Sequence, residues 1–247
     1  MNENPQKTSG EAGAINVSGV CKSFSGRAVL EGINFRLTRG QGLGICGPNA
    51  TGKTTLLKIA AGLMQPDEGV VEICGLDLQT ETPEIKLMIG AIFHESMVYP
   101  QLTVAENLLF FARLYNIENS KGRIEKLLEE TGLASCQHDA AGILSRGMTQ
   151  RLAIARALVH NPVVLLADEP FTGLDSQASK YLVEILRNFK DGGGTIVMTT
   201  HNANLSIQCC EQVAVLDERK LIFSAAVSEI DTSEFAQDYL SYARKKR

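Results

Sequence analysis

The chain has 247 residues, of which 44% are hydrophobic, and this is enough for one large α/β domain with a core of its own. Its 24 basic and 28 acidic residues give a net charge of −4, which argues against a nucleic-acid partner, since such proteins usually carry a basic surplus. No stretch approaches the roughly 20 apolar residues of a membrane span, and residues 1–13, expected to be a disordered tail, lack the apolar segment of a signal peptide.

The first elements along the chain indicate an antiparallel sheet. Ile33, Phe35 and Leu37 alternate with polar residues, which is the period of a half-buried strand. Residues 69–73 have the pattern of a further strand, followed by a turn at Gly75. Together with the whole segment from Ile15 to Leu37, these strands predict an antiparallel sheet beside the loop described next.

A complete phosphate-binding pattern, G-x-x-x-x-G-K-[ST], occupies residues 47–54, between a predicted buried strand at 43–46 and a predicted helix from Thr55. The backbone N–H groups of such a loop and the dipole of the following helix form a cradle for phosphate. Lys53 is expected to reach the β- and γ-phosphates of a nucleotide, and the Thr54 hydroxyl is expected to ligate Mg²⁺. The predicted nucleotide-binding residues of this loop are Gly47, Pro48, Asn49, Ala50, Thr51, Gly52, Lys53, Thr54 and Thr55.

Residues 103–142 form a helical block between sheet elements. Thr103 and Glu106 make a capping box, and apolar residues follow at helical spacing up to Tyr115. A second helical pattern runs from Ile124 and stops at Gly132. We expect an inserted helical subdomain over about residues 96–160.

A strongly apolar strand at 163–167 ends in two acids, Asp168 and Glu169. Ligands bind at the carboxyl ends of the strands in open α/β sheets, so Asp168 is placed to hold a Mg²⁺ shell and Glu169 to polarise an attacking water. The next predicted strand, 195–199, leads to His201 at the same edge. That position suits a contact from His201 to the γ-phosphate.

A second anion site is predicted at residues 144–152, where a helix begins. Ser145 is a good N-cap, and Gly147 lets a ligand approach the backbone closely. This helix start lies about 90 residues from the phosphate-binding loop. Either the chain folds the two sites together or two chains share them.

The second half of the chain alternates helices with strands at 163–167, 195–199 and 213–216, which predicts a mainly parallel core sheet with crossover helices. The expected fold class is therefore α/β. Residues 226–247 are expected to form a C-terminal helix and a basic tail. The six cysteines show no C-x-x-C spacing, so buried reduced thiols in a cytosolic protein are the favoured interpretation.

Over about residues 15–223 the chain resembles an ABC-type ATPase domain, because five motifs occur in that family's order and spacing. They are Walker A (47–54), the signature (144–150), Walker B (164–168 with Glu169), a D-loop-like segment (173–175) and the switch-like His201. The resemblance implies a P-loop NTPase domain over residues 14–225, with ATP and Mg²⁺ as cofactors and Glu169 and His201 as catalytic residues. It also implies a head-to-tail dimer in which the signature of one copy covers the γ-phosphate held by the other; the signature residues are Ser145, Arg146, Gly147, Met148, Thr149 and Gln150.

The same resemblance assigns Phe24 to adenine stacking and Asp175 to the D-loop; the alternative for Phe24 is a buried strand phenylalanine. Ala50 stands where the family usually has glycine, so nucleotide binding should survive provided that Ala50 avoids a positive φ. His94 stands where the family usually has a glutamine that touches Mg²⁺ and the attacking water. Because Mg²⁺ prefers oxygen ligands, either Glu95 or a water takes over, or coupling at this loop is altered.

A single such domain without a membrane span resembles the separate ATP-binding subunit of a transporter. This implies transmembrane permease subunits, a second ATPase subunit (a copy of this chain or a different one) and a peripheral position on the cytoplasmic face of the cell membrane. Residues 99–115 resemble export-type subunits, and residues 47–50, His94 and 145–148 most resemble the haem-exporter ATP-binding subunit of bacterial cytochrome c maturation. The alternatives are another exporter of drugs, lipids or polysaccharides, an iron–sulfur-assembly ATPase, and a regulatory module that hydrolyses little; Glu169 argues against the last.

Overall fold

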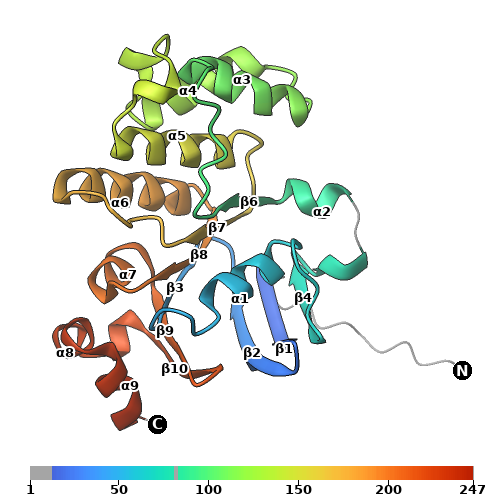
Figure 1. Cartoon of the computed structure of the whole chain (residues 1–247), viewed down its shortest axis with the longest axis vertical. Helices are drawn as coiled ribbons and strands as arrows, with labels where there is room; N and C mark the ends of the chain where they lie inside the picture. Colours follow the sequence, from blue (N-terminus) through green and yellow to red (C-terminus); the bar gives the residue numbers. More distant parts are fainter. Residues whose placement is uncertain (1–12, 81–82, 247) are drawn as a thin grey trace, which may run out of the picture.

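The computed structural model describes residues 13–80 and 83–246, and its α/β architecture confirms the predicted fold class (Figure 1). The strands are β1 (Ile15–Phe24), β2 (Arg27–Leu37), β3 (Gly42–Cys46), β4 (Glu68–Ile73), β5 (Leu76–Asp77), β6 (Ile89–Ile92), β7 (Val164–Asp168), β8 (Thr195–Thr200), β9 (Gln212–Asp217) and β10 (Lys220–Ala226). The helices are α1 (Lys53–Ala60), α2 (Pro83–Leu87), α3 (Val104–Leu114), α4 (Ser120–Glu130), α5 (Arg146–Leu158), α6 (Ser176–Asp191), α7 (Ala203–Cys209), α8 (Thr232–Gln237) and α9 (Tyr239–Lys246).

The core sheet has the strand order β10-β9-β3-β8-β7-β6. Five neighbouring strands run parallel, and β10 is the antiparallel edge. The inner strands β3, β7 and β8 are buried along their whole length, as expected of strands covered by helices on both faces. Because these strands are parallel, the loops that follow β3, β8, β7 and β6 leave the same edge of the sheet.

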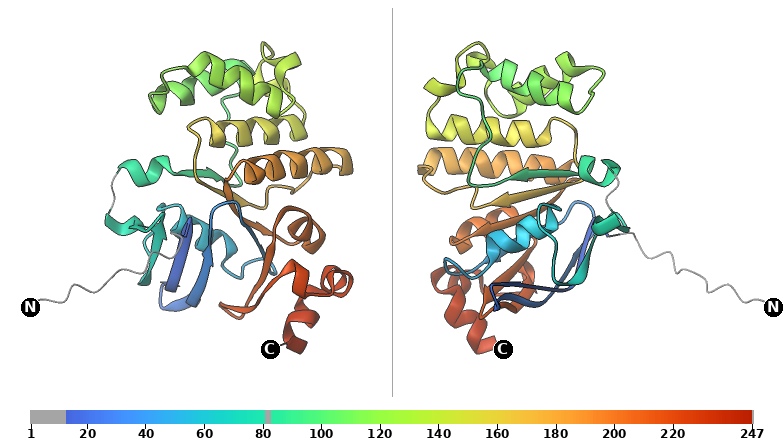
Figure 2. Two further views of the ribbon diagram at one scale, coloured as in Figure 1. Left: turned by 180° about the vertical axis from the view of Figure 1, so that it is seen from behind. Right: turned by 45° about the vertical axis from the view of Figure 1, so that its right-hand side comes forward.

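The predicted antiparallel sheet is present beside the core, with the order β2-β1-β4-β5 (Figure 1). The alternation expected in β2 is confirmed, since Ile33 and Leu37 are buried while Asn34 and Arg36 are exposed. Helix α1 lies between this sheet and the core sheet in both views of Figure 2. Its apolar residues join the antiparallel sheet and the core strands into one hydrophobic cluster.

The helical block α3–α5 lies at the far side of the core sheet from α8 and α9 (Figures 1 and 2). The predicted capping box is confirmed: the Thr103 hydroxyl accepts from Glu106 N at 3.1 Å, and Glu106 Oε2 accepts from Thr103 N at 2.8 Å. Helix α4 ends just before Gly132, as its pattern predicts. In the sequence, the helical block is inserted between β6 and β7, two neighbouring strands of the core sheet.

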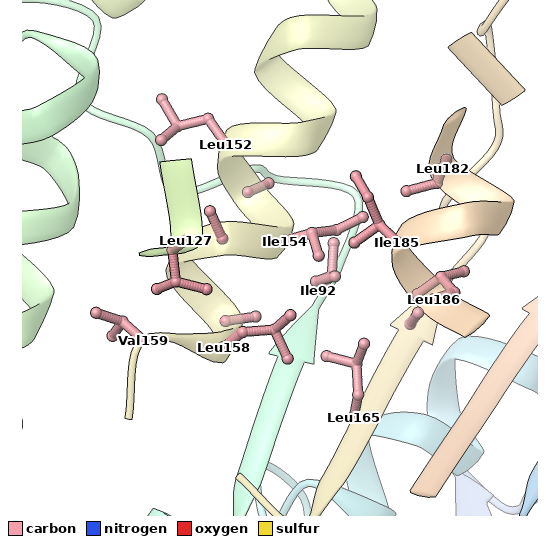
Figure 3. Close-up of a cluster of buried hydrophobic side chains, with 14 of the residues drawn as sticks. Ile92, Leu127, Leu152, Ile154, Leu158, Val159, Leu165, Leu182, Ile185 and Leu186 are labelled. Carbon is pink, nitrogen blue, oxygen red and sulfur yellow. The ribbon is translucent and has the colours of Figure 1, made fainter. Parts of the chain in front are cut away.

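Apolar packing between strands and helices holds the helical block against the core sheet. Figure 3 shows Ile92 of β6 and Leu165 of β7 beside Ile154 of α5 and Ile185 of α6. Each of these side chains is at most 5% exposed, and burying one contributes about 1.5–3 kcal/mol. The helical block is therefore anchored on β6, the strand that leads to His94.

The C-terminal region differs from its prediction of one helix and a basic tail. Strand β10 is followed by two helices, α8 and α9, and residues 244–246 belong to α9. Arg244 pairs with Asp217 at 2.9 Å and Lys245 with Glu234 at 2.7 Å, so these basic groups tie the helices to the domain. Phe235 of α8 is fully buried, and its cluster reaches Cys46 and Ala203.

All six cysteines are free thiols, and four are buried: Cys46, Cys136, Cys209 and Cys210. Burial raises the pKa of Cys46 to about 11 and of Cys209 to about 12, so both stay protonated and unreactive at neutral pH. None of the helices formed by residues 13–80 and 83–246 is long and apolar enough to cross a membrane.

Candidate functional site

The candidate site is built where four neighbouring strands end. Cys46 of β3 lies opposite Thr200 of β8, and Asp168 of β7 lies opposite Thr199. The loops after these strands carry the phosphate-binding pattern, Glu169 and His201. Sheet register thus brings together segments that are more than 100 residues apart in sequence.

The phosphate-binding loop runs from the end of β3 into α1. A left-handed Gly52, with φ +104°, caps the helix, and a Cβ there would lie 2.9 Å from Leu30 Cδ2, so only glycine fits. The buried Lys53 ammonium donates to the carbonyl oxygens of Gly47 at 2.7 Å and Pro48 at 3.0 Å. Lys53 therefore lies folded along the loop that it is predicted to serve.

Ala50 does not meet the condition stated for it above. Its φ is +64°, in the left-handed region where a Cβ crowds the following carbonyl group. A residue other than glycine costs about 1–2 kcal/mol in this conformation. The loop therefore adopts the geometry usual for glycine while carrying alanine, and it stores strain at an exposed position.

Glu169 lies between the side chains of Lys53 and His201. Its Oε1 is 3.5 Å from Lys53 Nζ, and its Oε2 is 2.8 Å from His201 Nδ1. A cavity of about 340 Å³ brings Glu169 together with the phosphate-binding loop; its lining is Val29, Asn49, Ala50, Gly52, Lys53, Thr54, Thr55 and Glu169. The structure thus joins the predicted nucleotide-binding and catalytic residues in one place.

Asp168 and Thr54 are suited to a divalent cation. Asp168 is buried, and its Oδ2 accepts from the Thr54 hydroxyl at 2.7 Å. Both groups are oxygen donors of the kind that Mg²⁺ prefers, and a cation would offset the charge of the buried carboxylate. These residues fit the predicted Mg²⁺ ion.

His94 lies in a second cavity, of about 240 Å³, which shares Asp168 and Glu169 with the site. The other lining residues are Phe93, Ser96, Arg146, Thr149, Gln150 and Thr172. The loop that carries His94 therefore lies next to Asp168 and Glu169 at the end of β7. Glu95, the alternative oxygen ligand, is exposed and is not part of this lining.

The signature segment forms the start of α5, where the Ser145 hydroxyl accepts from Met148 N at 3.3 Å. A Cβ on Gly147 would lie 2.9 Å from Ala178 Cβ of α6, so close helix packing already requires glycine there. The Arg146 guanidinium lies against Gly173, whose φ is +74°. Ser145 lines neither cavity of the site, but Arg146, Thr149 and Gln150 of the signature line the cavity of His94, next to Asp168 and Glu169.

Two further predicted residues can be located. Asp175 caps α6, with Oδ1 accepting from Ala178 N at 2.7 Å. Phe24 ends β1 and is 43% exposed, with Lys22 Nζ 5.7 Å from its ring centre, so the alternative of a buried strand phenylalanine is wrong. Its ring is free to stack on a ligand.

Sequence reasoning missed Thr199, the residue in contact with both acids. It lies in β8, fully buried, 2.6 Å from Asp168 Oδ1 and 3.1 Å from Glu169 N. A β-branched residue inside a strand is ordinary, so its only signal is the register of β8 against β7.

Comparison with known proteins agrees with this geometry. The family model of the ABC transporter matches residues 30–172, more than half of the chain. The Nod factor export ATP-binding protein I of Paraburkholderia xenovorans is 35% identical over 229 residues, covering 92% of this chain and 75% of that protein. The ABC transporter ATP-binding protein NatA of Bacillus subtilis is 34% identical over 209 residues, covering 83% of this chain and 85% of that protein.

A solved ATP-binding cassette, a dimer in a post-hydrolysis state bound to ADP and Pi, shares the fold with a TM-score of 0.76 and 27% identity. The alignment covers 86% of this chain and 98% of that one. Motifs, strand-edge geometry, the family model and relatives above 30% identity all agree. The chain belongs to the ABC transporter family and is one of its ATP-binding, ATP-hydrolysing subunits.

Proposed function

We propose that this subunit powers export through separate membrane subunits, using a site in which Lys53, Glu169 and His201 act on the γ-phosphate of ATP. The observation that supports this most strongly is the position of Glu169, whose carboxylate lies within 3.5 Å of both Lys53 Nζ and His201 Nδ1. A carboxylate held there can accept a proton from water, while its two neighbours stabilise the negative charge that develops.

The roles follow from chemistry. Lys53 carries a buried positive charge that can turn from the loop carbonyls to the β- and γ-phosphates. Thr54 and Asp168 would hold Mg²⁺, which supplies charge neutralisation at the phosphates when bound. Phe24 offers an exposed ring for adenine, and His94 adjusts the hydrogen-bonded water next to Glu169.

The working unit in this proposal is a dimer with ATP between two subunits. Ser145, which caps α5, lines neither cavity that contains Glu169, whereas Arg146, Thr149 and Gln150 of the same helix line the cavity of His94. A second copy, or a related subunit, would bring its own phosphate-binding loop to this helix start. The dimeric cassette of similar fold supports the arrangement.

The membrane partner has a candidate surface on α3. An open groove of about 710 Å³ is lined by Leu102, Glu106, Leu109, Phe110, Arg113 and Leu114. Phe110 is 43% exposed and Leu114 is 64% exposed, and both line this one groove, so their apolar surface is gathered in one place. Docking there would keep the subunit on the cytoplasmic face of the membrane. The double variant Phe110→Glu, Leu114→Glu should be released from the membrane fraction when cells of the source organism are fractionated. Leu63 is as exposed as Leu114, so Leu63→Glu serves as the control and should stay with the membranes.

Export is favoured because the relatives found include one named for Nod factor export. The narrower prediction of haem export depends on the resemblance of residues 47–50, His94 and 145–148 alone. The relatives reported above give it no support, since they are named for Nod factor export and as NatA. Stimulation of ATPase activity by candidate substrates, in the presence of the membrane subunit, would identify the cargo.

Two substitutions test the ATPase proposal. Lys53→Ala should abolish ATP binding in calorimetry, because the loop loses its fixed cation. Glu169→Gln should keep binding but slow turnover by about 100-fold or more, because an amide cannot accept the proton of water. Unchanged ATP binding in Lys53→Ala, or full activity in Glu169→Gln, would contradict the assigned roles.

A further inference from the structure

One hydroxyl group connects the two acids at the end of β7. Thr199 of β8 lies directly opposite Asp168 in the parallel register and is 0% exposed. Its Oγ1 is 2.6 Å from Asp168 Oδ1 and 3.1 Å from Glu169 N. The contact with the Asp168 carboxylate is buried, where hydrogen bonds to charged groups are strongest, and the contact with Glu169 N is partly buried.

The direction of these two hydrogen bonds is fixed by their partners. An ionised carboxylate can only accept, and a backbone N–H can only donate. The single hydroxyl proton of Thr199 therefore goes to Asp168, and its lone pair receives the N–H of Glu169. Neither valine nor alanine at position 199 could make either bond.

For Asp168, the consequence is a fixed carboxylate plane. Thr199 occupies Oδ1, and the Thr54 hydroxyl contacts Oδ2 at 2.7 Å. The oxygen on the side of Thr54 is thus the one presented to the phosphate-binding loop. Without the Thr199 hydroxyl, the buried Oδ1 would lose a partner and the carboxylate could rotate.

For Glu169, the consequence is support of a strained backbone. Its φ of +48° is rare for a residue with a Cβ, and its N–H is held by both Oγ1 and the carbonyl oxygen of Thr199, each at 3.1 Å. This turn places the Glu169 carboxylate between Lys53 and His201.

We infer that Thr199 is a positioning residue for both acids, which orients Asp168 toward the metal and Glu169 toward the attacking water. The inference rests on the proposed function, since it assumes those two roles. It predicts that loss of the Thr199 hydroxyl weakens the contribution of Mg²⁺ to nucleotide binding and slows turnover, while nucleotide binding without metal is kept.

The test compares Thr199→Val with the parent, with Thr199→Ser, which keeps the hydroxyl, and with Thr195→Val. Thr195 is a matched control because it lies in the same strand, is also 0% exposed, and donates to Thr38 O at 3.2 Å, away from the site. For each purified full chain, the affinity for a fluorescent ATP analogue is measured in EDTA and in Mg²⁺, together with kcat and KM.

In Thr199→Val, we expect the Mg²⁺-dependent gain in affinity and kcat each to fall by about 10- to 100-fold, the usual effect of losing a hydrogen bond behind a metal ligand. Its affinity in EDTA should stay close to that of the parent. Thr199→Ser should restore both quantities, and Thr195→Val should match the parent in both even if its Tm falls. If circular dichroism shows that Thr199→Val does not fold, Thr199→Ala is judged by the same criteria.

The inference is overturned if Thr199→Val keeps the metal-dependent gain and kcat of the parent, or if Thr195→Val loses as much. Failure of the proposed function has a different appearance. In that case the parent does not hydrolyse ATP, and any binding of the analogue is unchanged by Lys53→Ala.

Discussion

Replacing Ala50 with glycine should stabilise the protein, although glycine usually destabilises. The φ of Ala50 is +64°, and a residue with a Cβ pays about 1–2 kcal/mol there. Glycine removes that cost but adds about 0.5–1 kcal/mol of chain entropy to the unfolded state. The difference is a net gain of about 0–1.5 kcal/mol, and its centre, about 0.75 kcal/mol, corresponds to a rise in Tm of about 1.5–3 °C for a domain of this size.

The assay is thermal unfolding followed by circular dichroism, with Ala140→Gly as the matched control. Ala140 has a φ of −63°, which suits alanine, so glycine there should lower the Tm. The two identical substitutions should thus shift the Tm in opposite directions. If Ala50→Gly lowers the Tm, or if both variants move together, strain is not stored at Ala50.

Three further predictions concern the dimer, the histidine loop and a buried histidine. Mixing Ser145→Arg chains with Lys53→Ala chains should recover ATPase activity. One of the two ATP sites in the mixed dimer then combines an intact phosphate-binding loop from one chain with an intact start of α5 from the other. If both mutants fold and associate but no activity returns, ATP sites shared between two chains are excluded. His94→Gln should hydrolyse ATP at least as fast as the parent in a phosphate-release assay, and a large loss would give His94 a direct catalytic role. Burial lowers the pKa of His160, so the unfolded state binds more protons and stability should fall as the pH drops below about 6.5. In urea titrations His160→Gln should reduce that fall, whereas His138→Gln, at an exposed position, should not.

The parts of the fold that sequence reasoning predicted are those with a local signal. The phosphate-binding loop is recognisable from its own letters, and the Thr103–Glu106 capping box marks the start of α3 within four residues. The buried strand before Asp168 is equally local, because its run of apolar residues stops at a charge. Each of these needs no knowledge of distant segments.

The parts that were missed depend on contacts between distant segments. Strand β10 and the division of the predicted C-terminal helix into α8 and α9 depend on packing against β9 and α7, which the weak pattern of residues 220–246 does not reveal. The role of Thr199 depends on register, since a shift of one residue in β8 would turn its hydroxyl away from Asp168. The positive φ of Ala50 has no local signal either, because alanine rarely adopts this conformation.

The two strained residues at the site, Ala50 and Glu169, differ in what their strain achieves. At Glu169 the left-handed turn aims a carboxylate between Lys53 and His201, and hydrogen bonds from Glu169 N to Thr199 offset its cost. Among the described contacts no such hydrogen bond supports Ala50, and no step proposed here uses its methyl group. A strained backbone that positions a reacting group persists because its surroundings support it. A strained backbone that positions no reacting group and has no such support can be relaxed by substitution. For this reason glycine at position 50 should raise stability and leave the chemistry intact, while at position 169 the turn cannot be relaxed without moving the carboxylate.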